Sequence, residues 1–257
     1  MPSAPDELRT LVEERLESLR LWPDLHGQAE SVRYSITVGG KRVRPVICLA
    51  TAEAAGAPAE EALPAGCALE LVHTFSLVHD DLPALDNDEE RRGQASTWKR
   101  YGESIGILAG DALLAEAFRL ATSYETSHVA RELANATLGM IGGQYLDVTG
   151  TAPDEPTLHK LKTGCLFAAA VGLALWVAGV PEDEQRAWRA FGDELGLLFQ
   201  IVDDILDGDG YVASHGAGGA RRYADEAAER ARARLSAVDA DTSVLREIVD
   251  SLAVRTA

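Results

Sequence analysis

The chain has 257 residues, enough to bury a sizeable core, and 41 acidic against 24 basic residues give it a formal net charge of −17. A nucleic-acid-binding protein normally shows the opposite balance, so we expect no nucleic-acid partner. The three cysteines, Cys48, Cys67 and Cys165, are widely spaced without a metal-ligand pattern, which favours reduced, buried thiols in a cytoplasmic protein.

Helical periodicity extends over nearly the whole chain, whereas period-two runs of β-branched residues are missing. Prolines and glycines fall between the periodic segments. The predicted helices cover residues 5–20, 24–38, 43–56, 59–81, 95–104, 105–123, 126–147, 155–179, 182–193, 194–208, 221–237 and 241–254. This pattern predicts an all-α fold, a single-domain bundle of ten or more helices over residues 1–257.

Two segments bear on membrane association. The N-terminal stretch is polar and helix-periodic, unlike a signal peptide. Residues 164–180 carry no charge and reach the lower edge of a membrane-spanning length. Because the surrounding chain is polar, we expect a helix buried on all sides and no membrane span.

The first cluster of cations follows two glycines in VGGKRVRP, residues 38–45. Lys41, Arg42 and Arg44 therefore sit beside flexible backbone, an arrangement that suits a diphosphate. A helix N-terminus with ordinary surface charges is the alternative. Farther along, Lys162 and Thr163 directly precede the uncharged helix, where a snorkelling lysine would look the same.

Carboxylates are concentrated at the end of an apolar helix in LVHDDLPALDNDEERRG, residues 77–93. Asp80 and Asp81 fall at the negative end of the helix dipole, and Asp86 follows after a bend. Such carboxylates are costly when buried unless they are paired or bind metal. A solvated acidic loop that pairs with Arg91 and Arg92 is the alternative.

A second acidic stretch, GLLFQIVDDILD at residues 196–207, repeats this pattern. Gln200, Asp203 and Asp207 share one helix face, with Asp204 beside them. Two carboxylate clusters on apolar helices indicate one acidic cleft. Many hard oxygen ligands suit Mg²⁺ or Mn²⁺, and Mg²⁺ usually accompanies phosphate.

These motifs together resemble the trans-isoprenyl diphosphate synthases, the polyprenyl synthetase family, and most of all its bacterial farnesyl diphosphate synthase-like members. The matching segments run from about residue 30 to 210 in the order of the family. They are GGKRVRP, ELVHTFSLVHDDLPALDND, RRG, LAGDALL, GGQYLD, KTG and FQIVDDILD. The resemblance implies the isoprenoid synthase fold and a homodimer.

The resemblance also implies the site residues. Metal ligands would be Asp80, Asp81, Asp86, Asp203 and Asp207, holding three Mg²⁺ ions for which Mn²⁺ can substitute. Arg91 and Lys162 would bind the allylic diphosphate, and Lys41, Arg44, His73 and Arg92 the isopentenyl diphosphate. Thr163 and Gln200 would line the place where charge develops. Without the resemblance, His73 would more simply be a core histidine.

The implied reaction joins isopentenyl diphosphate head-to-tail to an allylic diphosphate, dimethylallyl or geranyl, and releases diphosphate. Phe75 lies five residues, or about 7.5 Å, below Asp80 along the helix and would close the cavity for the product tail, while Ser76 is too small to block it. In the enzymes that the chain resembles, an aromatic residue at this place stops chain growth near fifteen carbons, so the resemblance implies farnesyl diphosphate as the product. Geranylgeranyl and geranyl diphosphate are the alternatives.

The sequence departs from the family after the second acidic stretch. A basic loop of some twenty residues is missing between Gly210 and Tyr211, and a smaller gap falls near Tyr124 and Glu125. Either the sequence lacks a segment that the protein has, or the protein lacks the loop. The second case keeps a non-catalytic regulatory subunit open. A class I terpene cyclase is disfavoured by GGKRVRP, which cyclases do not share.

Overall fold

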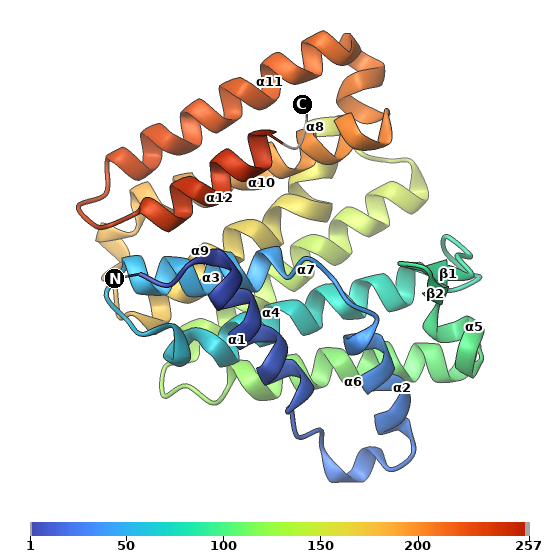
Figure 1. The fold of residues 1–257 in the computed structure, drawn as a ribbon. Coiled ribbons are helices and arrows are strands. Elements are labelled where there is room, and N and C mark those ends of the chain that lie inside the picture. Colours follow the sequence, from blue (N-terminus) through green and yellow to red (C-terminus); the bar gives the residue numbers. More distant parts are fainter. Residues whose placement is uncertain (1, 255–257) are drawn as a thin grey trace.

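The expected all-α architecture is confirmed in the computed structural model, which describes residues 2–254 (Figure 1). The α-helices are α1 (Pro5–Glu17), α2 (Gln28–Thr37), α3 (Val43–Ala54), α4 (Ala59–Asp80), α5 (Thr97–Tyr101), α6 (Glu103–Ala121), α7 (Ser127–Thr149), α8 (Glu155–His159), α9 (Cys165–Val177), α10 (Arg186–Asp207), α11 (Gly210–Ser236) and α12 (Ser243–Val254). Short helical turns are η1 (Pro23–Leu25), the π-helical turn η2 (Lys160–Gly164) and η3 (Glu182–Glu184). Strands β1 (Glu90–Arg91) and β2 (Gln94–Ala95) form an antiparallel hairpin.

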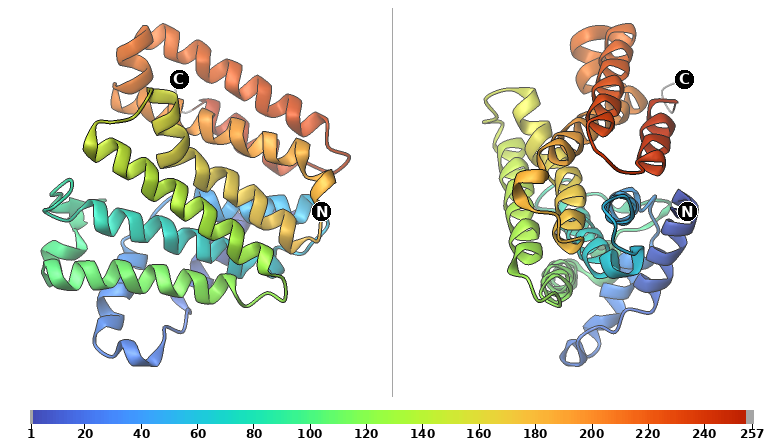
Figure 2. Two further views of the ribbon diagram at one scale, coloured as in Figure 1. Left: turned by 180° about the vertical axis from the view of Figure 1, so that it is seen from behind. Right: turned by 90° about the vertical axis from the view of Figure 1, so that its left-hand side faces the viewer.

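Two helices form the centre of the bundle. Helix α4 packs against α3, α6 and α9, and α9 packs in turn against α3, α7 and α10. Helices α11 and α12 lie at the end of the bundle opposite α2 and α6 (Figure 2). One contiguous cluster of buried apolar side chains runs from Leu8 in α1 to Leu252 in α12. A shared core of this kind is what one domain requires, although the boundaries 1–257 stay a prediction.

The uncharged stretch near residue 170 forms α9, a core helix. The run Glu155–Val177 is long and apolar enough to cross a membrane, but core helices pass the same test of length and composition. Leu166, Phe167 and residues 169–175 are all buried against neighbouring helices. The expectation of a buried helix is therefore confirmed.

The predicted helix boundary at residues 193 and 194 is wrong, because α10 continues unbroken across it. Two glycines of α10 allow this helix to pack closely against its neighbours. A Cβ at Gly192 would lie 3.2 Å from Ala168 Cα, and one at Gly196 would lie 3.0 Å from Gly164 Cα. Small residues at these two positions let α10 approach α9 closely.

Helix α11 begins at Gly210, eleven residues before the predicted start at residue 221. The glycine-rich sequence of residues 208–219 reads as a loop. In the structure this segment is helical on both sides of a kink at Gly216, whose φ of 70° and ψ of 160° are not helical. Glycine adopts such a conformation without steric cost, so the kink is confined to one residue.

Candidate active site

A cavity of about 720 Å³ opens between α3, α4, α6, α7, α9 and α10. Most of the predicted site residues line it: Arg44, His73, Phe75, Ser76, Asp80, Lys162, Thr163 and Asp203. These residues come from sequence segments up to 159 positions apart, from Arg44 to Asp203. The structure therefore brings the two acidic stretches and two of the basic segments to one cavity.

The acidic side of the cavity carries carboxylates that are difficult to ionise. Burial raises the pKa of Asp80 to about 6, and the negative charge of nearby Asp86 adds to the effect. Burial likewise raises the pKa of Asp203, helped by Asp207. Asp86, in the turn after α4, and Asp207, the last residue of α10, are themselves exposed. A bound cation would relieve this arrangement, because it favours the ionised carboxylates.

The basic side of the cavity is built from α3, α4 and η2. The Arg44 guanidinium lies 4.4 Å from the Phe167 ring centroid, a cation–π contact. Burial lowers its pKa and also lowers that of His73, which faces the positive charge of Arg44. The imidazole of His73 is therefore neutral near pH 7. Glu70 and Asp203 lie near Arg44, but among the described residues neither forms an ion pair with it, so the guanidinium is suited to an anionic ligand.

The loop before α3 is held by a buried ion pair. Arg42 Nη1 donates to Glu70 Oε1 at 2.7 Å, and Arg42 Nη2 donates to the Ile36 carbonyl at 2.7 Å. Arg42 adopts a φ of 50°, and Gly39 and Gly40 before it also have positive φ. Of the two arginines in GGKRVRP, Arg42 therefore fixes the loop and Arg44 reaches the cavity. Lys41 is exposed, but its charge lowers the pKa of Asp203.

Asp81 and Arg91 lie against each other and do not line the cavity. Arg91 Nε donates to Asp81 Oδ1 at 3.0 Å. The tight turn of the β1–β2 hairpin, with φ of 55° at Arg92 and 76° at Gly93, positions this arginine. Arg92 donates instead to the Gly39 carbonyl. The alternative of a solvated acidic loop paired with Arg91 and Arg92 is met only in part. Asp81 is paired with Arg91 but is buried, while Asp80 faces the cavity.

Gln200 lies at a second cavity, of about 560 Å³, between α7, α8, η2, α9 and α10. Its side-chain amide donates to Asp204 Oδ1 at 2.7 Å. The sequence predicts Gln200 and Asp203 on one helix face. Three residues turn the helix by about 300°, so the two side chains point only about 60° apart, yet each lines a different cavity. The π-helical turn η2 contributes to both walls, with Leu161 and Gly164 on one side and Lys162 and Thr163 on the other.

Phe75 and Ser76 both line the first cavity. The Phe75 side chain is 7% exposed and meets the His79 ring edge-on at 5.0 Å between centroids. Ser76 donates its hydroxyl to the His73 carbonyl at 2.8 Å, which holds this small side chain against its own helix. Phe75 is therefore the bulkier of the two at this part of the wall.

The motif GGQYLD, residues 142–147, contributes site residues that were not predicted from the sequence. Asp147 forms an ion pair with Lys162, and Gln144 lines the cavity with a buried Nε2 that has no hydrogen-bond partner. Gly143 allows the contact, because a Cβ there would lie 2.4 Å from the Lys162 backbone nitrogen. The i, i+3 spacing of Gln144 and Asp147 is the signal that marks this face of α7.

The chain passes directly from α10 to α11 through Gly208 and Asp209, without a basic loop. Tyr211 donates its backbone N–H to Asp204 Oδ2 at 2.9 Å. The smaller gap near residue 124 falls in the short connection between α6 and α7. There the Tyr124 hydroxyl donates to the Glu61 carbonyl at 2.7 Å.

Comparisons of the sequence and of the structure with known proteins point to the same family. The sequence model of the polyprenyl synthetase family matches residues 28–219. A geranylgeranyl diphosphate synthase from Cyanophora paradoxa is 44% identical over 194 residues, covering 69% of this chain and 64% of that protein. A farnesyl diphosphate synthase from Bacillus subtilis (strain 168) is 40% identical over 196 residues, covering 70% and 66%. The chain thus spans about two thirds of the length of these relatives. A crystal structure of a geranylgeranyl pyrophosphate synthase superposes with a TM-score of 0.90 at 26% identity, covering 99% of this chain and 100% of that one.

Proposed function

The chain belongs to the polyprenyl synthetase family, and on that premise we propose that it is a prenyltransferase that condenses isopentenyl diphosphate with dimethylallyl or geranyl diphosphate. The product is farnesyl diphosphate, and inorganic diphosphate is released. The observation that carries this proposal is the single cavity lined by Asp80 and Asp203 on one side and by Arg44, His73 and Lys162 on the other. An acidic and a basic set around one apolar space suit two diphosphates and a hydrocarbon.

The carboxylates fit divalent magnesium. Asp80 and Asp203 would hold Mg²⁺ in the cavity, because hard oxygen ligands are what this ion takes. Asp86 and Asp207 lie near enough to these two carboxylates to raise their pKa values, so they would help to hold the ion. The raised pKa values of Asp80 and Asp203 support the assignment, since burial without a cation is costly. Bound Mg²⁺ would supply charge to stabilise the departing diphosphate. The proposal includes three bound Mg²⁺ ions, the number that the resemblance implies.

The basic side chains of the cavity fall into two groups, one for each of the two diphosphates. Lys162 on η2 faces the same cavity as Asp80 and lowers that carboxylate's pKa, so it is placed to bind the allylic diphosphate. Arg44 lies against the rings of Phe167 and Phe199 and lines the cavity together with His73, so these two residues suit the isopentenyl diphosphate. Thr163 lies beside Lys162 on the wall. Neutral His73 donates hydrogen bonds without adding to the repulsion among the cations.

Much of the rest of the wall is apolar, although His79, Asp111 and Gln144 also line it. Leu77, Leu114, Met140, Leu166 and Phe199 line it. An allylic carbocation forms when diphosphate leaves, and the isopentenyl double bond attacks it before a proton is lost to the released diphosphate. Water would quench that cation, so a dry wall preserves the reaction.

Phe75 supports farnesyl diphosphate as the product. Its ring stands about 7.5 Å along α4 from Asp80, where the growing hydrocarbon extends away from the diphosphate. The names of the relatives divide between geranylgeranyl and farnesyl diphosphate synthases. Geranylgeranyl diphosphate is therefore the second candidate product. To make room for this longer chain, the Phe75 ring would have to rotate away from the cavity.

A homodimer is part of the same proposal. Large apolar side chains are exposed on α6 and α7: Ile107, Leu108, Leu138, Ile141, Tyr145 and Val148. The two helices pack against each other, and we infer that these residues form one apolar face. Exposed apolar patches of this size typically mark protein interfaces. The last three of them also line the mouth of the cavity, which a second copy would cover.

The test is incubation of the purified chain with dimethylallyl and isopentenyl diphosphates and Mg²⁺, followed by chromatography of the dephosphorylated products. We expect farnesol as the main alcohol. Geranylgeraniol would support the second candidate, and a cyclic hydrocarbon would support a cyclase. No turnover alone, with turnover restored by an active partner, would support a regulatory subunit and contradict the proposal.

A further inference from the structure

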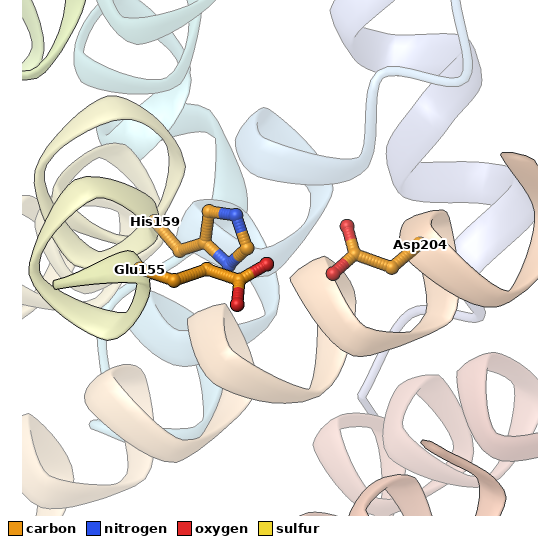
Figure 3. A group of neighbouring side chains, drawn as sticks. All are labelled: Glu155, His159 and Asp204. Carbon is orange, nitrogen blue, oxygen red and sulfur yellow. The ribbon is translucent and has the colours of Figure 1, made fainter. Parts of the chain in front are cut away.

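A histidine and two carboxylates converge at the junction of α8 and α10, outside the cavity described above. Glu155 and His159 are four residues apart on α8 and share one face, and Asp204 faces them from α10 (Figure 3). One ligand atom from each residue lies within 4.8 Å of the other two. Among residues 2–254 no other trio of histidine, cysteine, aspartate or glutamate meets this distance.

The histidine has an unmet bonding capacity. His159 Nδ1 is buried and has no hydrogen-bond partner in the described structure. In Figure 3 the ring lies beside the Glu155 carboxylate, with the Asp204 oxygens turned toward both. A buried ring nitrogen without a partner is costly, and a metal ion is one partner that an imidazole nitrogen readily takes.

Asp204 gives a second, independent reason to expect a cation. The residue is 4% exposed. Its carboxylate accepts from the Gln200 amide at 2.7 Å and from the Tyr211 backbone N–H at 2.9 Å, both neutral donors. Within the described part of the chain no lysine, arginine or histidine forms an ion pair with it. Each carboxylate oxygen retains a free lone pair, so Asp204 can bind a cation without losing either hydrogen bond.

The trio is separate from the proposed magnesium site. Asp203 lines the 720 Å³ cavity, whereas none of the trio does. His159 lines the other cavity, together with Gln200. Adjacent residues on a helix point about 100° apart, which turns Asp204 away from Asp203. The two sites also differ in ligand type, because the trio offers an imidazole.

We propose that Glu155, His159 and Asp204 bind one divalent transition-metal ion of the zinc class. One imidazole and two carboxylates are ligands for Zn²⁺, Co²⁺ or Mn²⁺, while Mg²⁺ favours oxygen alone. Bond lengths of about 2.0–2.2 Å place ligand atoms about 3.3–3.6 Å apart in a tetrahedron. Because the ligand atoms lie within 4.8 Å of one another, each pair needs to close by at most about 1.5 Å on binding. Glu155 is exposed and on a five-residue helix, and it can make this movement.

Such an ion would fasten α8 to α10 beside the turn into α11. Asp204 already holds the first turn of α11 through the Tyr211 N–H, and the Ser214 hydroxyl donates to Glu155 at 3.2 Å. Three helices therefore meet at the trio. The ion binds the folded chain alone, so it raises the melting temperature. This role does not depend on the proposed prenyltransferase activity.

The experiment titrates the metal-free chain with Zn²⁺ by calorimetry in a buffer containing millimolar Mg²⁺, and with Co²⁺ by visible absorption. We expect one Zn²⁺ per chain, and a Co²⁺ spectrum with a nitrogen ligand. Glu155→Gln and His159→Gln should each weaken binding at least tenfold. His215→Gln, on α11 nearby, and Asp80→Asn, in the other site, should bind as the unmodified chain does.

Thermal unfolding separates loss of metal from loss of fold. In EDTA the Glu155→Gln and His159→Gln variants should melt with the unmodified chain. Zn²⁺ should raise the melting temperature of the unmodified chain and of the two control variants, but not that of Glu155→Gln or His159→Gln. Equal zinc binding by all the variants would overturn the proposal. So would loss of zinc binding in Asp80→Asn, since that would place the ion in the magnesium site.

Discussion

Replacing Asp80 with asparagine should stabilise the metal-free protein. Burial raises the pKa of this carboxyl from 3.8 to about 6, so its ionised form is unfavourable in the fold. At 1.36 kcal/mol for each tenfold change, that difference corresponds to about 3 kcal/mol. The side chain is partly exposed, and solvent screening reduces the expected gain to about 1–2 kcal/mol.

The sign follows from proton linkage. Between pH 3.8 and about 6 the folded chain binds more protons at Asp80 than the unfolded chain does, so stability falls as the pH rises through this range. Below pH 3.8 the carboxyl is protonated in both states and costs nothing. Asp80→Asn should therefore gain little at pH 3.5 and its full increment from about pH 6.5 upward.

The assay is thermal unfolding in EDTA at several pH values. For a chain of this size about 1–2 kcal/mol corresponds to a rise of about 2–8 °C in Tm. Asp225→Asn, an exposed aspartate on α11, removes the same charge and should leave the Tm unchanged. An Asp80→Asn variant that melts with or below the unmodified chain at pH 7.5 would refute the reasoning.

Further predictions concern the wall, the packing and the dimer. Phe75→Ala should shift the product toward geranylgeranyl diphosphate in the chromatographic assay. An unchanged product profile would show that the Phe75 ring does not limit the length of the product. Gly143→Ala should lower the Tm and cut turnover by displacing Lys162, since overpacking costs about 1–3 kcal/mol; Gly142→Ala, whose Cβ would meet nothing within 4 Å, should change neither. Leu138→Asp, at a side chain 67% exposed on α7, should convert a dimer to monomers in light scattering, while Val254→Asp on α12 should not.

Much of the fold was predictable because helical periodicity and chain breaks are local signals. Nearly every α-helix was predicted within a few residues. The failures fall where glycine has a role that depends on a distant neighbour. Gly192 and Gly196 allow α10 to approach α9, and neither contact is visible in a local window. Gly216 permits a kink within a segment whose glycines suggested a loop.

The site was predictable as far as residue types and spacing define it. Asp80 and Asp203 could be placed at one cavity because both end apolar helices. Which of two adjacent aspartates faces that cavity depends on partners elsewhere in the chain. Asp81 is taken by Arg91 through a hairpin whose strands are only two residues long. Asp204 points toward α8, and no sequence pattern predicts that His159 lies next to it.

The central claim is that the two acidic stretches act on one substrate cavity. The most direct measurement is the steady-state turnover of Asp80→Ala and Asp203→Ala with both diphosphates and Mg²⁺, on samples whose folding has been checked by thermal unfolding. Each variant should keep a cooperative unfolding transition and lose turnover by at least a thousandfold, about 4 kcal/mol in the barrier. Near-normal turnover in either variant would contradict the account.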